Sequence, residues 1–139
     1  CTVTGLARSM AAFACAETGG DLRQQSMVKL RDAMMAYPEL VAGETRACTE
    51  LMRAMGGKVA IKTGAEAVFV AIIPPLKMGI ALKIVDGSTR GAEAAIAAIL
   101  VKLGVLNATH PATIARMTPQ LKNWRGVVTG FIRPTAALT

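Results

Sequence analysis

The stretch VAIKTGAEAVFVAIIPPLKMGIALKIV, residues 59–85, decides the fold of this chain because short apolar runs alternate in it with turn-forming residues. The runs 59–62, 67–73 and 79–85 are rich in valine and isoleucine, which favour strands. The segments between these runs are short and contain glycine or paired prolines. Turns of this kind join antiparallel neighbours, so the stretch predicts a three-stranded antiparallel meander.

Three helices are predicted before the meander, because alanine or other apolar residues recur there at helical spacing. In the second of them, Met27, Leu30 and Met34 lie on one face, and Asp21 is a suitable N-cap. Glycine pairs and a proline separate the segments, since both end helices. The predicted helices are residues 5–16, 22–36 and 44–55.

After the meander, Asp86-Gly87-Ser88 is a turn and cap signal that opens an amphipathic helix ending at Gly104. The apolar stripe of this helix is predicted to pack on the sheet. A proline-interrupted segment follows, in which residues 126–133 are predicted to be a last strand. The chain is therefore predicted to be an α+β domain, residues 1–139, with an antiparallel sheet and flanking helices.

Length and composition are those of a folded domain, with 139 residues of which 53% are hydrophobic. Apolar runs such as Ala67 to Ile73 are far shorter than the roughly 20 residues of a membrane-spanning helix, so no membrane partner is expected. The chain opens at Cys1 without a signal-peptide pattern, and its three cysteines form no CxxC pair. A cytoplasmic protein without disulfides is the expectation.

The net charge of +7 invites a nucleic-acid interpretation, but the distribution of charge does not support it. The sixteen lysines and arginines are spread from Arg8 to Arg133, and only 4% of the residues are aromatic. A single-strand binder combines a basic groove with aromatic stacking platforms. We therefore expect no nucleic-acid partner, and we expect another part of the same protein to carry compensating acidic residues.

Lys62-Thr63-Gly64, at the end of the first predicted strand, is the strongest chemical signal in the sequence. A lysine there is either an ordinary surface residue or lies in a partly buried site, where it suits proton transfer. Thr63 adds a hydroxyl beside it, and Gly64 lets a substrate lie close to the strand. Lys-Thr-Gly on a strand is similar to the signature of the penicillin-recognising serine hydrolases, which place it opposite a Ser-x-x-Lys helix.

A wider resemblance covers essentially the whole chain. The residues that carry it are Pro38 to Arg46, Cys48-Thr49, Leu51-Met52, Lys62 to Glu66, Gly79 to Ile84, Asp86-Gly87, Asn123, Gly126, Gly130 and Ile132-Arg133-Pro134. In their order and spacing the chain resembles the asparaginase II family, the thermolabile, rhizobial-type amidohydrolases. The resemblance implies a serine β-lactamase/glutaminase-like fold and hydrolysis of a small carboxamide such as L-asparagine.

The resemblance also implies that this chain supplies part of a larger site. In the family, the lysine that matches Lys62 takes part in catalysis beside a serine. In the family that serine belongs to a Ser-x-x-Lys segment upstream of the residues that match this chain. The chain has one Ser-x-x-Lys sequence of its own, Ser26 to Lys29, inside the predicted helix 22–36. The chain would then be the C-terminal part, or a processed subunit, of an enzyme whose N-terminal half is its partner, and the complete unit would form a homo-oligomer.

Other residues near the motif are expected to contact the substrate. Arg46 could hold a substrate carboxylate in a bidentate fork, or it could simply cap a loop. Cys48 lies on the apolar face of its predicted helix, where core packing is the default, but the cysteine that matches it lies close to the family's site. Ala67 departs from a glycine that is common in the family, which affects the expected shape of the loop. The expected substrate-binding residues are Thr63, Gly64, Arg46, Cys48 and Glu66.

Cys1 matches a cysteine that is a zinc ligand in metal-binding members of the family. In one interpretation the chain is trimmed there, and Cys1 is a zinc ligand without its partners, since a zinc site needs at least three protein ligands. The only histidine, His110, precedes Pro111 in a predicted loop. In the other interpretation the precursor cleaves itself before Cys1, and the new α-amine serves as base for an N-terminal thiol nucleophile.

No cofactor is required for the expected chemistry, and zinc is the one metal considered. Two further functions stay open at this stage. One is an inactive subunit or fragment of the family, with the serine nucleophile in the missing half. The other is a basic binding module.

Overall fold

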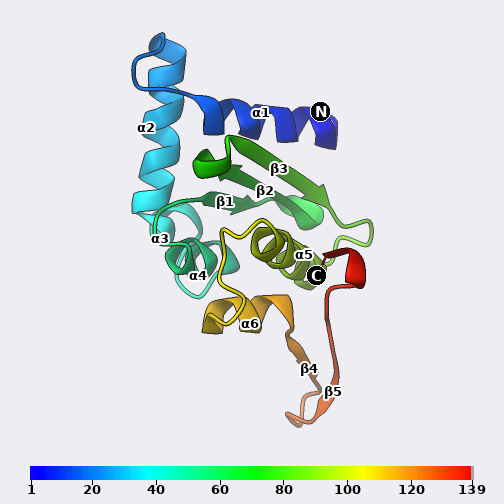
Figure 1. The fold of residues 1–139 in the computed structure, drawn as a ribbon. Helices are drawn as coiled ribbons and strands as arrows, with labels where there is room; N and C mark the ends of the chain where they lie inside the picture. The colour runs from blue at the N-terminus through cyan, green and yellow to red at the C-terminus, as the bar shows by residue number, and fades with distance from the viewer. Residues whose placement is uncertain (139) are drawn as a thin grey trace.

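The sheet of the chain is a three-stranded antiparallel meander, seen in a computed structural model that describes residues 1–138 (Figure 1). Its strands are β1 (Ala60–Thr63), β2 (Val68–Ile73) and β3 (Met78–Lys83), in the order β1-β2-β3. Helices pack on the sheet, so the α+β prediction is confirmed. Two short 3-10 turns, Ala65–Ala67 and Pro74–Leu76, connect the strands.

The register of the strands decides which side chains share a face. Lys62 pairs with Val70, and Val70 pairs with Ala81. Paired residues in an antiparallel sheet lie on the same face, and the next residue along a strand lies on the other. Lys62 therefore lies on the face opposite to that of its neighbours Ile61 and Thr63.

Helices cover both faces of the sheet (Figure 1). On one side lies α1 (Val3–Cys15), and on the other lie α4 (Ala47–Ala54) and α5 (Thr89–Lys102). One continuous core joins α4, the sheet and α5. The largest fully buried side chains of this core are Phe69, Leu51, Met52, Ile61, Ile73, Ile96 and Leu100.

Two predicted helix starts are confirmed by their caps. The helix α2 (Leu22–Ala36) has the predicted bounds, and Gln24 N–H donates to Asp21 Oδ1 at 2.9 Å. In α5 the N-cap is Ser88, whose Oγ accepts from Gly91 N–H at 3.3 Å. Such caps satisfy backbone donors that the first turn of a helix leaves free.

The predicted helix 44–55 is wrong in its first residues. Pro38 ends α2 as expected, but it also begins a short helix, α3 (Pro38–Ala42), because proline suits the first helical position. A turn follows in which Gly43 and Thr45 both have positive φ, and α4 begins only at Ala47. The chain therefore enters α4 from a tight turn and not from an extended helix.

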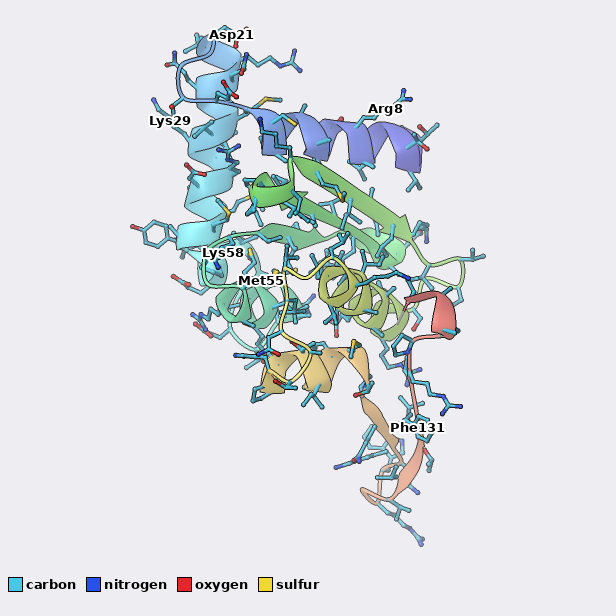
Figure 2. The ribbon with its side chains drawn as sticks, viewed as in Figure 1. Arg8, Asp21, Lys29, Met55, Lys58 and Phe131 are labelled. Carbon is cyan, nitrogen blue, oxygen red and sulfur yellow. The ribbon has the colours of Figure 1, made fainter. Side chains whose placement is uncertain are left out.

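The C-terminal segment has more structure than the sequence predicted. A short helix, α6 (Pro111–Met117), begins at one of the prolines that interrupt this segment, because proline suits the first helical position. The predicted strand 126–133 is shorter, β5 (Val128–Phe131), and pairs with β4 (Gln120–Lys122) in a separate hairpin. Figure 2 shows Phe131 on this hairpin, which extends away from the helices and the larger sheet. A last 3-10 turn spans Ala136–Leu138.

None of the helices described within residues 1–138 has the length and hydropathy of a membrane span.

Gly79 allows α1 to lie directly on β3. A Cβ atom at this position would overlap the backbone atoms of Ala7, Met10 and Ala11 in α1. The contact is between two backbones, so no side-chain rotation can relieve the overlap. The helix can cover this face of the sheet only because residue 79 lacks a side chain.

We therefore predict that Gly79→Ala lowers the free energy of unfolding by about 1–3 kcal/mol or more, because overpacking a rigid contact forces backbone shifts. Urea denaturation measures this loss. Gly19→Ala is the matched control, since a Cβ there meets nothing within 4 Å, and its effect should stay within about 0.5 kcal/mol. Equal effects of the two substitutions would contradict the close approach of α1.

Candidate active site

The end of β1 presents its backbone to the open edge of the sheet. Gly64 N–H donates to Val68 O at 2.8 Å, and backbone direction alternates along an antiparallel strand. The N–H and C=O of Thr63, one residue earlier, therefore point away from β2. Two side chains meet these groups: Thr63 N–H donates to Cys48 Sγ at 3.3 Å, and Lys62 Nζ donates to Thr63 O at 2.7 Å.

Cys48 is the buried residue at this edge, with 1% of its surface exposed. Burial raises the pKa of its thiol, and a smaller effect of Glu93 acts in the same direction. The Thr63 N–H and the positive charges of Lys62 and Arg46 oppose the rise in pKa but do not cancel it. The thiol is therefore protonated at neutral pH. In this structure it serves as a hydrogen-bond acceptor for the strand edge.

Four of the residues singled out from the sequence thus come together. Arg46, Cys48, Lys62 and Thr63 lie around one point, where the start of α4 meets the end of β1. Arg46 is the N-cap residue of α4 and is exposed, so its guanidinium is open to solvent. Gly64 follows directly and is also exposed. Contact of any of these residues with a substrate stays a prediction.

Lys62 is partly buried beside a cavity of about 310 Å³. Among the described residues that line it, only Lys62 is charged. An ammonium group beside apolar walls is less well solvated than a surface lysine, which strengthens its interactions with nearby polar atoms. The apolar lining residues are Met10, Phe13, Leu30, Met34, Ala60, Val70 and Ile72.

The loop after the motif has an unusual backbone. Glu66 and Ala67 have φ values of 52° and 58°, which lie in the left-handed region that favours glycine. Lys83 Nζ donates to Glu66 O and, at 2.9 Å, to Ile84 O, so β3 holds the loop from the side. Ala67 thus adopts a conformation typical of glycine, at a cost of about 1–2 kcal/mol. The Glu66 side chain is exposed.

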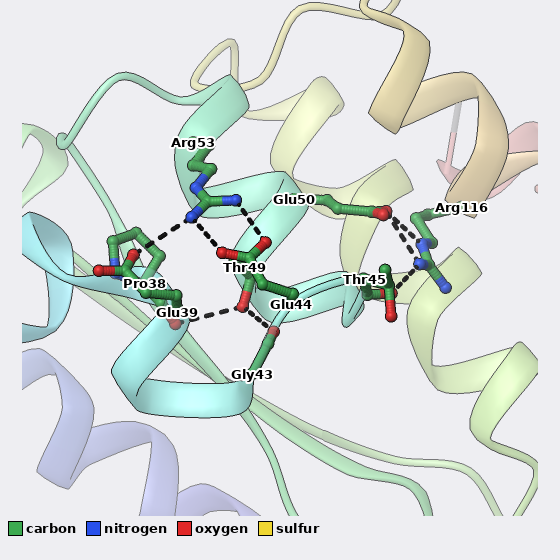
Figure 3. Close-up of polar contacts among 9 residues, drawn as sticks. All are labelled: Pro38, Glu39, Gly43, Glu44, Thr45, Thr49, Glu50, Arg53 and Arg116. Atoms are coloured by element: carbon green, nitrogen blue, oxygen red, sulfur yellow. Dashed lines mark hydrogen bonds and ion pairs between the residues drawn. The ribbon is translucent and has the colours of Figure 1, made fainter.

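The turn before α4 is fixed by Thr49, as Figure 3 shows. Thr49 is fully buried, and its hydroxyl donates to Gly43 O at 2.6 Å, with Pro38 O at 3.2 Å. On the outer side of α4, Arg53 pairs with Glu44 at 2.8 Å and with Glu39 at 3.3 Å. These contacts tie α3, the turn and α4 into one unit.

Cys1 lies apart from these contacts. It is exposed at the start of the chain, and its Sγ donates to Thr2 O at 3.4 Å. Within residues 1–138 no hydrogen bond joins Cys1 to Lys62, Thr63 or Cys48. Its expected roles as nucleophile and as zinc ligand stay predictions.

The described residues do not assemble a zinc site. No group of three or more His, Cys, Asp or Glu side chains that could hold a metal is found within residues 1–138. Among residues 1–138, Cys1 is therefore not joined by the two or more further protein ligands that a zinc site requires. His110 is the N-cap of α6, where its Nδ1 accepts from Ala112 N–H at 3.2 Å. We derive no chemical step through zinc.

Sequence reasoning did not single out Arg116, which Figure 3 shows beside Glu50 and Thr45. This residue of α6 contacts Glu50 of α4, Glu93 of α5 and the carbonyl oxygen of Thr45. Glu50 lies 66 positions away and Glu93 lies 23 positions away. No local pattern connects such distant partners, so only the fold reveals the cluster.

A comparison with models of known protein families identifies the family of the chain. The model of the L-asparaginase II family matches residues 1–134. The chain belongs to this family, whose description is that of an asparaginase-like amidohydrolase. A search of curated proteins found no significant match.

We predict that the three thiols react at two different rates. Cys1 and Cys15 are exposed and Cys48 is buried, so a disulfide reagent such as 5,5′-dithiobis(2-nitrobenzoate) should label two thiols quickly and the third only when the structure opens. Mass spectrometry of partly labelled protein identifies the slow position. Rapid labelling of Cys48 would contradict its burial against Thr63.

The raised pKa of Cys48 also predicts a pH dependence of stability. A thiol whose pKa is higher in the folded state contributes stability below its unfolded pKa of about 8.5. That stability is lost as the pH rises through the folded value. The free energy of unfolding should therefore fall above about pH 8.5, and Cys48→Ala should reduce this fall. An unchanged alkaline slope in Cys48→Ala would contradict the prediction.

Proposed function

We propose that this chain supplies the Lys62 side of an active site that hydrolyses a small carboxamide, with L-asparagine as the first candidate. The proposal rests on family membership and on one observation. The Lys-Thr-Gly motif ends an edge strand, and Lys62, Thr63, Arg46 and Cys48 gather there. A partly buried lysine beside an open strand edge suits proton transfer or stabilisation of developing negative charge.

Each residue then has a defined task. The substrate lies along the open edge of β1 at Gly64, where there is no side chain in its way, and Thr63 offers its hydroxyl. Arg46, exposed at the N-cap of α4, holds the substrate carboxylate through paired hydrogen bonds. Cys48 holds the strand edge in place through Thr63 N–H.

The reaction has two stages. The nucleophile attacks the carboxamide carbon, and Lys62 transfers the proton of the nucleophile to the leaving nitrogen. The C–N bond then breaks, and ammonia leaves. Water then attacks the covalent intermediate, releases the carboxylic acid and returns a proton to the nucleophile. The negative charge on the former carboxamide oxygen is the charge that Lys62 stabilises in the alternative, electrostatic role.

The nucleophile is a serine of an N-terminal part of the protein, or it is Cys1 of this chain after cleavage of a precursor. In the complete enzyme, Cys1→Ala distinguishes the two. Loss of activity by a factor of about 10² or more would assign the attack to Cys1. Full activity would assign it to the serine. Assembly into a homo-oligomer and a cytoplasmic location stay part of the proposal.

We predict that Lys62→Ala lowers kcat for ammonia release from L-asparagine by about 10²- to 10⁴-fold, the usual contribution of an acid–base group. Lys62→Arg keeps the positive charge, but a guanidinium does not give up its proton near neutral pH. This variant should stay inactive if Lys62 transfers protons, and it should recover activity if Lys62 only stabilises charge.

The matched control is Lys58→Ala, which removes an exposed lysine just before the same strand (Figure 2). It should leave kcat unchanged. Equal activities of Lys62→Ala, Lys58→Ala and the unsubstituted enzyme would contradict the proposed role of Lys62.

A further inference from the structure

Arg116 sits where three elements and a strained turn meet. Its Nε donates to Glu50 Oε2 at 2.9 Å, its Nη1 donates to Glu93 Oε2 at 3.1 Å, and its Nη2 donates to Thr45 O at 2.7 Å. The Arg116 and Glu93 side chains are 24% and 18% exposed, so solvent screens these contacts less than it screens surface pairs. Each of the three guanidinium nitrogens thus donates a hydrogen bond, to α4, to α5 and to the turn before α4.

The charge of Arg116 is secure. Burial alone would lower the pKa of its guanidinium, but the hydrogen bonds and charges of Glu50 and Glu93 outweigh burial and raise the pKa above its ordinary value. Arg116 is therefore a permanent cation beside the carboxyl groups of Glu50 and Glu93.

The bond to Thr45 O has a specific structural consequence. Thr45 has a φ of 64°, a left-handed conformation that costs a β-branched residue energy. A hydrogen bond to its carbonyl oxygen fixes the peptide plane that joins it to Arg46. Because Arg46 is the next residue and the N-cap of α4, the direction in which its side chain leaves the turn depends on this peptide plane.

Arg116 is also connected to the strand edge. Glu50 lies on α4 two residues after Cys48, whose Sγ accepts from Thr63 N–H. By holding both Thr45 and Glu50, Arg116 fixes the start of α4 at two points on either side of Arg46 and Cys48. Without it, the remaining hydrogen bonds of this turn in Figure 3 come from Thr49 and Arg53, which hold Gly43, Pro38, Glu44 and Glu39.

We infer that Arg116 is a positioning residue, which sets Arg46 for the substrate carboxylate and Cys48 for the Lys-Thr-Gly edge without touching the substrate itself. This inference rests on the proposed function for the role of Arg46, but its effect on Cys48 is independent of catalysis. Arg116 holds Thr45, the strained residue directly before Arg46, so we expect its loss to change the start of α4 before it changes the rest of the fold.

The first test measures the Cys48 thiol in a chain with Cys1→Ser and Cys15→Ser. Loss of a charged hydrogen bond weakens the local structure, so Arg116→Ala should raise the labelling rate of Cys48 about tenfold. Arg53→Ala is the matched control. It removes an arginine with two ion pairs from α4, the helix that carries Cys48, and Arg53 does not contact Thr45. It should leave the labelling rate unchanged. Equal acceleration by both substitutions, or by neither, would overturn the inference.

The second test uses the complete enzyme and L-asparagine. Misplacing a group that binds ground state and transition state alike raises KM and leaves kcat nearly unchanged. Arg116→Ala should therefore raise KM about 10- to 100-fold, and Arg116→Lys should recover part of the loss. If Arg116 acts through Arg46, the double variant Arg46→Ala/Arg116→Ala should have the same KM as Arg46→Ala alone. Additive losses would overturn the inference.

Two further measurements keep the outcomes distinct. Circular dichroism and thermal unfolding identify a variant that fails to fold. If Arg116→Ala fails to fold, Glu50→Gln replaces it, because this substitution keeps the size of the side chain and removes one charge from the Arg116 cluster. An unsubstituted enzyme without amidase activity would reject the proposed function. The labelling of Cys48 would still decide whether Arg116 positions the start of α4.

Discussion

The site depends on one hydrogen bond between the edge of strand β1 and the start of helix α4. Thr63 N–H points away from the sheet and donates to Cys48 Sγ at 3.3 Å, and this contact fixes the distance between β1 and α4. An edge strand leaves backbone groups free, and here one of them is used to hold a helix. The residue before Thr63 is Lys62, and the N-cap residue of the helix is Arg46. A lysine and an arginine far apart in the sequence are thereby brought to the same point.

The surrounding structure makes this contact rigid from several sides. The core of α4, the sheet and α5 buries Leu51, Ile61 and Ile96 completely. Below it, Arg116 joins α6 to α4 and α5 through two carboxylates. On the other face, Gly79 lets α1 lie directly on β3. Of the four described non-glycine residues with positive φ, three lie in the two turns that lead into this contact and out of it, namely Thr45, Glu66 and Ala67. A rigid frame around strained turns is the usual arrangement at functional sites.

The sequence predicted those parts whose signals are local. The meander followed from valine and isoleucine runs with short turns, and the bounds of α2 followed from Asp21 and Pro38. Lys62-Thr63-Gly64 was found because three adjacent residues carry the signal. The short helices α3 and α6 were missed because each begins with a proline, which marks both the end of one helix and the start of another. Arg116 was missed because Glu50 and Glu93 are its neighbours only in the fold.

The most direct measurement is an amide chemical-shift titration of the complete enzyme with the product, L-aspartate. If the open edge of β1 is the substrate site, the largest shifts will fall on Thr63, Gly64 and the turn around Arg46, and Lys62→Ala will weaken them. Shifts confined to the α1–α2 region or to the hairpin of β4 and β5 would contradict the assignment. The substrate would then bind elsewhere, and the Lys-Thr-Gly edge would have only a structural role.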